Sequence, residues 1–267
     1  TQPLKSMMEY FYHQNPNVLD VLNTAKVLTG TMVLFSAGRF GLTPRATIYV
    51  SLHASYLVWW FIEQYFFPPF WHRFSAEVHS LYECLPILCI VGLLYSFPAY
   101  NVICRSDRKQ DISPLMTIVC VMMFTLGSLI NTMSDVHMHA TKEAMAPQKV
   151  LITNGLYRLC QNPNYFGDYL RYTSFCLSSG KASSFVVLGV VLLLNFLSTL
   201  DAAQKGGMRE KYGVAYDEWT KEVPNFVVPS LNKNIVEVAL VISAVWIGSY
   251  LLGLSSRSMS MKKGKIL

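Results

Sequence analysis

The stretch that decides the fold is LITNGLYRLCQNPNYFGDYLRYTSFCLSSG, residues 151–180. A polar Asn-Pro-Asn-Tyr turn at residues 162–165 opens a segment that is otherwise apolar enough to enter a bilayer. Polar groups at membrane depth are costly, and they usually mark a functional site. The stretch therefore predicts a membrane segment whose polar first turn is a candidate for chemistry.

The composition of the whole chain supports a membrane environment. Of 267 residues, 52% are hydrophobic and only 14% are charged, whereas soluble domains carry about 25% charged residues. Lipid offers no partner for a free backbone group, so uninterrupted apolar runs select helices. The formal net charge of +6 is spread over loops and a short tail, which favours anionic lipid head groups over nucleic acid. We expect an all-α, polytopic transmembrane bundle with membrane lipids, and no nucleic acid, as partners.

About six or seven membrane helices are predicted, each from an apolar run near the roughly 20 residues that cross a bilayer. Lys26 and Gly30 weaken the first of these. The expected spans are Val18–Ala37, Thr47–Phe67, Cys84–Cys104, Pro114–Ser134, a tight hairpin of Tyr169–Ser179 with Phe185–Leu200, and Ile235–Leu254. Residues 135–167 form the longest polar stretch before the motif. An amphipathic helix at the membrane surface is expected near residues 207–221.

The apolar runs predict a single membrane domain over residues 1–267. Its parts are an N-terminal segment with a weak first span (1–46), three spans (47–134), a polar motif region (135–234), and an additional span with a basic tail (235–267). The tail ends KKGKIL, which resembles a di-lysine retrieval signal of the endoplasmic reticulum. The organelle stays open between the endoplasmic reticulum and the mitochondrial inner membrane.

No metal site is expected. The six cysteines form no close CxxC pair, so neither a zinc site nor a disulfide framework is indicated. His137 and His139 form His-x-His, but helix positions two apart point in different directions. The cysteines are expected to be small buried apolar residues.

Two linked motifs give the chain a family resemblance. LITNGLYRLCQNPNYFGD, followed at a distance by EKYGVAYDEWTKEVPNFVVP, resembles the C-terminal half of the steroid-reductase-like membrane family. That superfamily includes steroid 5-alpha reductases, sterol C14 reductases and, more remotely, isoprenylcysteine carboxyl methyltransferases. SDVHMHATKEA and SLHASYLVWWFIEQYFFP also resemble segments of one branch. The clear similarity covers residues 130–230.

The resemblance implies a pocket between membrane helices that holds NADPH beside an apolar lipid. In the methyltransferase relatives, the equivalent pocket holds S-adenosylmethionine. Tyr165 matches the motif as the candidate catalytic residue, which would donate a proton or a hydrogen bond to a carbonyl. The motif positions that would hold the cofactor are Gly155, Arg158, Asn164, Gly167 and Asp168.

The same residues also have structural interpretations. Asn162 and Asn164 beside Pro163 are suited to capping a helix and closing a turn. Tyr165 is equally suited to an interfacial anchor, and Asp168 to a charge at a helix N-terminus. The alternatives stay open at the level of sequence.

Glu63 lies near the end of an apolar span. An intramembrane acid is a functional candidate by default, and Glu63 is therefore a candidate residue on the substrate side.

The chain departs from the family pattern at two places. Gln161 stands where the family usually has Arg, which removes a fork-shaped donor suited to phosphate. Residues 203–206 read Ala-Gln-Lys-Gly, where the reductases carry an Arg-Asp-Glu-His-like run and the methyltransferases a pair of Glu residues. Two or three lost charge-assisted contacts, each worth about 1.5–3 kcal/mol, would weaken cofactor binding by orders of magnitude.

These features leave three functions open. The first is a degenerate reductase-like protein, with reduced or no catalysis and no cofactor, that serves as an accessory or structural subunit of a membrane protein complex. The additional span at residues 235–254 favours it, because such a helix suits packing against membrane partners. The alternative, favoured by the retained Asn-Pro-Asn-Tyr turn, is an NADPH-dependent reductase of a sterol-like or isoprenoid lipid. A methyltransferase comes third, because the acidic pair is missing.

Overall fold

The computed structural model describes residues 16–67, 74–104, 111–204 and 207–229. The chain divides into two compact units, Thr1–Val227 and Val228–Leu267, and every described helix belongs to the first unit. The predicted span Ile235–Leu254 and the basic tail lie outside the described residues.

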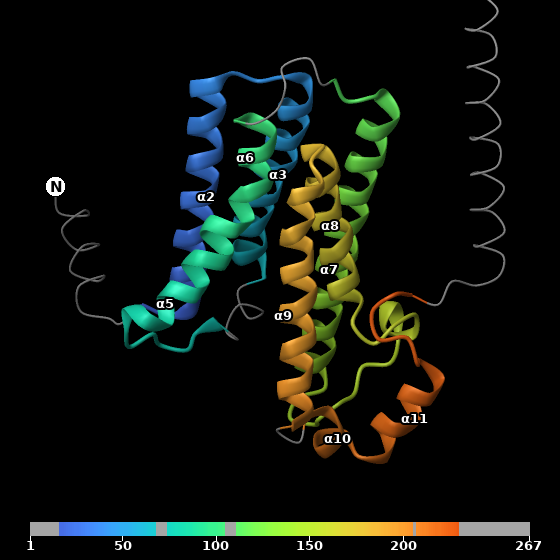
Figure 1. The fold of residues 1–267 in the computed structure, drawn as a ribbon. Coiled ribbons are helices and arrows are strands. Elements are labelled where there is room, and N and C mark those ends of the chain that lie inside the picture. Colours follow the sequence, from blue (N-terminus) through green and yellow to red (C-terminus); the bar gives the residue numbers. More distant parts are fainter. Residues whose placement is uncertain (1–15, 68–73, 105–110, 205–206, 230–267) are drawn as a thin grey trace, which may run out of the picture. The chain divides into compact units, whose positions relative to one another are not determined.

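The described residues form helices and one isolated antiparallel bridge between Asn17 and Glu77. Helix α8 lies along α7 and also contacts α3, α6 and α9 (Figure 1). The elements are α2 (Val18–Phe40), α3 (Pro44–Phe66), α5 (Leu81–Ile87), the π-helix η2 (Leu88–Leu93), η3 (Leu94–Ser96), α6 (Phe97–Ile103), α7 (Pro114–Ala144), η4 (Gly155–Arg158), α8 (Pro163–Ser179), η5 (Ala182–Ser184), α9 (Phe185–Gln204), α10 (Gly207–Tyr212) and α11 (Val214–Glu222).

Capping residues fix where the long helices begin. Asn17 and Asp20 form a capping box, in which each side chain accepts a hydrogen bond from the other's backbone N–H at 2.9–3.0 Å. Thr43 and Ser113 cap α3 and α7, and in both helices Pro occupies the first position. Pro suits that position because its missing N–H would have had no helical partner anyway.

The run from α5 to α6 is an interrupted helix. Pro86 lies inside α5 and is followed by the π-helix and a 3₁₀ turn before α6 begins. A proline removes a helical donor and displaces the carbonyl groups around it. The Thr29 hydroxyl of α2 lies 3.2 Å from the carbonyl oxygen of Val91 and 3.0 Å from that of Gly92. The neighbouring helix therefore partners these π-helical carbonyls.

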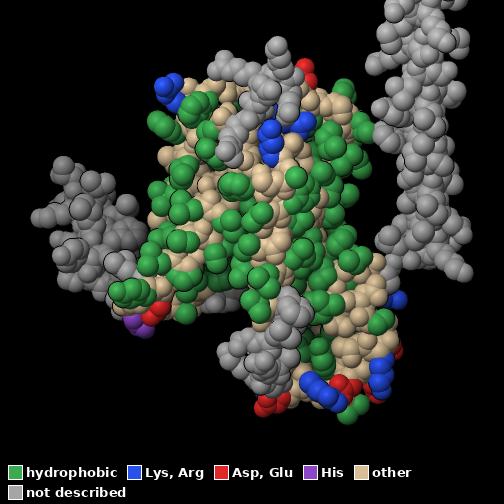
Figure 2. Space-filling model, in the orientation of Figure 1, with side chains coloured by type: hydrophobic (Ala, Val, Ile, Leu, Met, Phe, Trp, Pro, Cys, Tyr) green, Lys and Arg blue, Asp and Glu red, His purple; other side chains and the backbone are tan. Residues whose placement is uncertain are grey.

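The prediction of an all-α membrane bundle is confirmed. Three described helical segments are long and apolar enough to cross a membrane: Val18–Phe40, Tyr82–Ile103 and Pro114–Ala144. On the face shown in Figure 2, hydrophobic side chains cover the flank of the helices, and charged side chains gather at the two ends. The expected span Thr47–Phe67 corresponds to α3, which has the length but is not among the three, because Arg45 and Glu63 lower its hydropathy.

Helix α7 is longer than the predicted Pro114–Ser134. It continues through Ala144, so the first part of the polar stretch is helical rather than a loop. At 1.5 Å per residue, its 31 residues extend about 46 Å, against a hydrocarbon layer of about 30 Å. The polar end of α7 therefore extends past the hydrocarbon layer.

The predicted hairpin of α8 and α9 is present, and α8 begins earlier than expected, at Pro163. The turn is made by Gly180, whose φ of +69° favours glycine. The Arg45 guanidinium donates to the carbonyl oxygens of Leu177 and Ser178, both at 3.2 Å. A cation at a helix C-terminus satisfies carbonyls that have no helical partner.

The amphipathic helix expected near residues 207–221 is present as two short helices, α10 and α11, which meet at Gly213. Trp219 on α11 is buried against Tyr157, and its indole N–H donates to the Tyr157 carbonyl oxygen at 3.3 Å. This contact anchors α11 to the loop that precedes α8.

Candidate functional site

A cavity of about 450 Å³ lies between α2, α3, the η2–η3 run, α7 and α8. Volumes of 300–1,000 Å³ are typical of small-molecule sites. The α8 residues on its wall are Asn164, Tyr165, Asp168, Arg171 and Tyr172. Their spacing of three, four and seven places them on one helical face. The local sequence of α8 therefore suffices to bring the motif's polar residues to one cavity.

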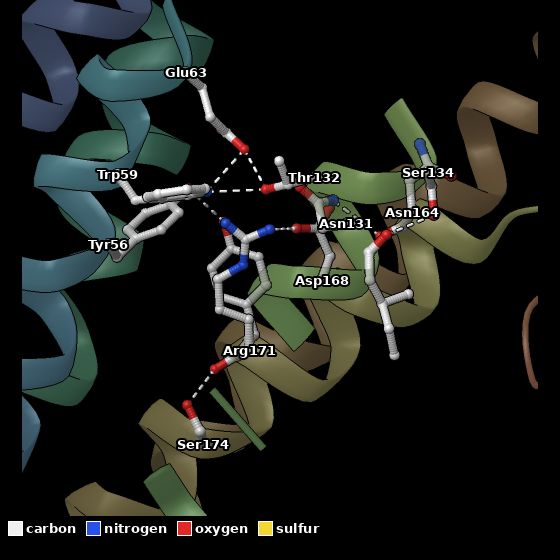
Figure 3. A network of polar contacts seen from close by, with 12 residues as sticks. Tyr56, Trp59, Glu63, Asn131, Thr132, Ser134, Asn164, Asp168, Arg171 and Ser174 are labelled. Carbon is white, nitrogen blue, oxygen red and sulfur yellow. Dashed lines mark hydrogen bonds and ion pairs between the residues drawn. The ribbon is translucent and has the colours of Figure 1, made fainter. Parts of the chain in front are cut away.

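Arg171 is the buried cation of this face. It is 3% exposed, and its Nη2 lies 3.1 Å from Asp168 Oδ1 (Figure 3). The guanidinium carbon lies 5.1 Å from the centre of the Tyr56 ring. The buried Nε atom has no hydrogen-bond partner among the described residues. A buried donor without a partner costs free energy, so Arg171 keeps donor capacity for a bound acceptor.

Glu63 connects the cavity wall of α3 with α7. Its side chain is buried, and Oε1 accepts hydrogen bonds from the Trp59 indole N–H, at 2.9 Å, and from the Thr132 hydroxyl (Figure 3). The Trp59 indole nitrogen also lies 2.9 Å from the Thr132 oxygen. Two donors on one oxygen hold the carboxyl group in a fixed orientation at the cavity.

A second buried cation, Lys26, reaches the cavity from α2. Its ammonium group donates to the Tyr56 hydroxyl. The nitrogen also lies 4.4 Å from the ring centre of Tyr56 and 4.1 Å from that of Trp60. Aromatic faces attract a cation most strongly where water is excluded.

The side of α8 that faces α7 is occupied by packing. A Cβ atom on Gly167 would lie 2.6 Å from both the Asn131 amide nitrogen and the Gly127 carbonyl oxygen. The Asn131 side-chain amide also donates to the Asn164 carbonyl oxygen at 3.0 Å. Gly167 therefore permits close approach of two helices, and it does not line the cavity.

The candidate site residues predicted from the motif fall into two groups in the structure. Asn164, Tyr165 and Asp168 lie on the cavity together with Glu63. Gly155 and Arg158 do not line this cavity.

Gly155 and Arg158 instead form η4. Gly155 has a φ of +59°, and a Cβ there would meet the His137 ring. Arg158 is exposed.

The side chains of residues 161 and 162 bind the segment after α11, and they do not line the cavity. Gln161 Nε2 donates to the Val223 carbonyl oxygen at 2.9 Å, and Asn162 Nδ2 donates to that of Phe226 at 3.1 Å. Asn162 is the residue before α8, but its side chain makes no capping hydrogen bond. The Gln that replaces the family's Arg thus has a structural partner.

Between these residues and η4, Cys160 is completely buried, and this burial raises the pKa of its thiol to about 11. The thiol is therefore neutral at physiological pH.

Lys26, Tyr56 and Arg171 also line this cavity, and none of them is among the site residues predicted from the sequence. In the sequence, Lys26 stands out only as a weakness of the first span, although an intramembrane charge is itself a functional signal. The α8 spacing would have placed Arg171 on the face of Asn164 and Asp168.

The helical bundle and its polar cavity define an integral membrane protein with an internal polar site. Residues 70–223, more than half of the chain, match the model of the family described as "Protein of unknown function (DUF1295)". The chain belongs to this family, which is the steroid 5-alpha-reductase-like family.

The chain is also similar to a Delta(14)-sterol reductase of Ascobolus immersus, with 28% identity over 81 residues. This match covers 30% of the chain and 19% of that reductase, so the chain spans about a fifth of the curated relative's length. The resemblance to the steroid-reductase-like family is confirmed, whereas the branch and the relation to the methyltransferases stay predictions.

Proposed function

We propose that this protein is a membrane reductase that uses NADPH to reduce a double bond in a sterol-like or isoprenoid lipid. The observation that carries the proposal is the meeting of Tyr165, Asn164 and Asp168 with Glu63 and a buried Arg171 around one cavity. The similarity to the fungal Delta(14)-sterol reductase supports the choice of reaction.

Several side chains around the cavity offer donors and acceptors that suit polar groups of NADPH. Arg171 has a buried Nε without a partner among the described residues, which suits a phosphate or carboxamide oxygen. Asp168, 31% exposed in its side chain, offers a carboxylate to a ribose hydroxyl. Asn164 offers an amide. When bound, NADPH supplies the hydride that reduces one carbon of the double bond.

The chain's own residues would supply the proton and the dry surroundings. Tyr165 is half-buried on the cavity wall, where its hydroxyl would give a proton to the second carbon of the double bond. Glu63, held by Trp59 and Thr132, would orient the lipid from α3. Hydride and proton together add two electrons and two hydrogens to the lipid.

The test is to purify the protein in nanodiscs, detect NADPH by native mass spectrometry, and follow NADPH oxidation with a Δ14-sterol diene and with an isoprenoid enone. We expect stoichiometric NADPH that is lost in Asn164→Ala, and turnover that is lost in Tyr165→Phe. The matched control is Tyr65→Phe, because Tyr65 is 79% exposed. Absence of NADPH binding and of turnover in the wild-type protein would contradict the proposal.

A second candidate is an accessory subunit of a membrane complex with reduced or no catalysis. It is favoured by residues 203–206, which read Ala-Gln-Lys-Gly where the relatives have charged groups. In that case several membrane proteins co-purify in fixed ratio and no nucleotide is bound. The same mass spectra would also detect bound S-adenosylmethionine. Binding of that cofactor instead of NADPH would favour a methyltransferase.

A further inference from the structure

The end of the bundle at which α2 turns into α3 is basic. The α2–α3 turn, the end of α6, the start of α7 and the α8–α9 turn lie together at the top of Figure 1. Lys and Arg side chains are visible at the same end in Figure 2. The described residues of these segments carry three cations, Arg39, Arg45 and Lys181, and one acid, Asp111.

This end is distinct from the cavity around Arg171. Lys26 lines that cavity, and Arg39 lies on the same helix about 20 Å further along its axis. The 23 residues of α2 extend about 34 Å, against a hydrocarbon layer of about 30 Å. A helix of this length that crosses the membrane brings Arg39, in its last turn, to the level of the lipid head groups.

Arg45 joins the segments of this end. Its Nη1 donates to the carbonyl oxygens of Leu177 and Ser178, and its Nη2 lies 3.5 Å from that of Asp111. Its buried Nε has no hydrogen-bond partner among the described residues. Carbonyl oxygens accept hydrogen bonds but do not neutralise a cation. Arg45 therefore keeps its net positive charge at this end.

The other two cations lie on either side of Arg45. A Cβ atom on Gly180 would lie 2.6 Å from the Nη1 atom of Arg45, and Lys181 is the next residue of the chain. The guanidinium carbon of Arg39 lies 5.8 Å from the centre of the Phe40 ring. Within the described part of the chain, no ion pair joins any of the three cations to a carboxylate.

A second cavity, of about 390 Å³, lies at this end. It is lined by residues 40–44, Ile103 and Cys104. Arg39 and Arg45 are therefore the residues directly before and after the main segment of its lining. The side chains of Phe40, Leu42 and Ile103 give the cavity apolar walls. An apolar cavity with a cation at each end of its lining suits a molecule that has a hydrocarbon part and an anionic part.

The position at the membrane surface narrows the choice of molecule. Basic pockets between membrane helices bind the head groups of anionic lipids. A free anion would leave the apolar walls without a contact. A zwitterionic lipid would bring its own cation toward Arg39 and Arg45. An anionic phospholipid uses both the charges and the walls.

We propose that this end of the bundle binds one anionic phospholipid, with its phosphate near Arg39, Arg45 and Lys181 and part of an acyl chain in the cavity beside Leu42. The site is more specific than the general attraction between a basic chain and a negatively charged membrane. It does not rest on the proposed function, because it lies outside the cavity that would hold the reactants.

The experiment uses the full chain in nanodiscs that contain equal amounts of phosphatidylglycerol and phosphatidylcholine. Native mass spectrometry counts the lipids that stay bound when the protein is released. We expect one phosphatidylglycerol to be retained at least fivefold more often than phosphatidylcholine. Inorganic phosphate at the same concentration should not displace it, because phosphate has no acyl chain. Equal retention of the two lipids, or displacement by phosphate, overturns the proposal.

The double variant Arg39→Gln/Lys181→Gln is expected to lower the retention of phosphatidylglycerol at least fivefold. Arg45 is left in place, because it also holds the end of α8. Arg209→Gln is the matched control, since Arg209 is a cation of α10 that is 77% exposed and pairs with Asp217. Unchanged retention in the double variant, or an equal loss in the control, overturns the proposal.

A measurement on the wild-type protein decides the matter if the double variant fails to fold. Cys104 lines the cavity, so a bound lipid should slow its alkylation by N-ethylmaleimide. We expect the rate at Cys104 to be at least threefold lower in nanodiscs with phosphatidylglycerol than in nanodiscs of phosphatidylcholine alone. Cys89, which is exposed, is the internal reference in peptide mass spectrometry. Equal rates at Cys104 in the two lipids overturn the proposal.

Discussion

Gly127 of α7 and Gly167 of α8 face each other so closely that a Cβ atom added to Gly167 would lie 2.6 Å from the Gly127 carbonyl oxygen. Small residues allow two membrane helices to approach to backbone contact. Because Asn164, Tyr165 and Asp168 lie on the same helix as Gly167, this contact also fixes where they stand at the cavity.

We predict that Gly167→Ala lowers the free energy of unfolding by about 1–3 kcal/mol, the usual cost of overpacking a well-packed contact. The helices must separate, so ligand binding at the cavity weakens as well. Thermal unfolding in nanodiscs measures the first effect. Gly189→Ala is the control, because nothing lies within 4 Å of the added Cβ there. Equal stability of the two variants would show that the contact is not tight.

The Arg171–Asp168 pair should respond asymmetrically to removal of either partner. Asp168→Asn leaves a cation that is 4% exposed without its partner charge, whereas Arg171→Met leaves a carboxylate that is 31% exposed. Breaking a buried pair costs about 3–5 kcal/mol when the remaining charge stays buried. We therefore expect Asp168→Asn to destabilise the protein more than Arg171→Met in denaturant titrations. The reverse order would mean that water reaches Arg171.

Replacing Glu63 should separate its acceptor role from its charge. Glu63→Leu removes the acceptor of both Trp59 and Thr132, and the loss of such bonds costs about 1–3 kcal/mol. Glu63→Gln keeps one acceptor oxygen and should cost less. Trp fluorescence and unfolding curves of the two variants make the comparison. Indistinguishable curves would rule out this hydrogen-bonded arrangement.

The thiol of Cys160 gives a prediction on pH. Burial raises its pKa to about 11, so the reactive thiolate is only about one part in a thousand at pH 8. Alkylation by iodoacetamide should therefore keep rising with pH up to 10, whereas an ordinary thiol with a pKa of about 8.5 levels off earlier. Peptide mass spectrometry measures the rate at Cys160, with the protein unfolded in detergent as control. Equal rates in folded and unfolded protein at pH 8 would contradict the burial.

Local helical spacing allows the sequence alone to predict which candidate residues share one face of α8. Asn164, Tyr165 and Asp168 follow one another on a single face of α8, and Glu63 carries the signal of an acid in an apolar helix. Lys26 and Tyr56 reach the same cavity only because α2 and α3 pack beside α8. That packing cannot be predicted from a single sequence.

The neighbours of the motif glycines and loop residues could not be predicted from the sequence. Gly155, Gly167 and Gln161 match or replace family positions, but their places in the structure depend on which neighbour occupies each side of the chain. His137, the backbone of α7 and the Val223 carbonyl oxygen are those neighbours. All three lie far from these residues in sequence or on another helix, so the motif itself gives no sign of them.

The length of α7 sets how reactants would reach the cavity. If Pro114 marks one boundary of the hydrocarbon layer, Asn131 lies about 26 Å along the helix, close to the opposite boundary, and Asp135 lies at or beyond it. In that placement the cavity wall spans the boundary between the hydrocarbon layer and water. A soluble nucleotide would enter from the aqueous side, and a lipid would enter laterally from the membrane leaflet. The nucleotide would then not have to cross the hydrocarbon layer, and the lipid would not have to cross water.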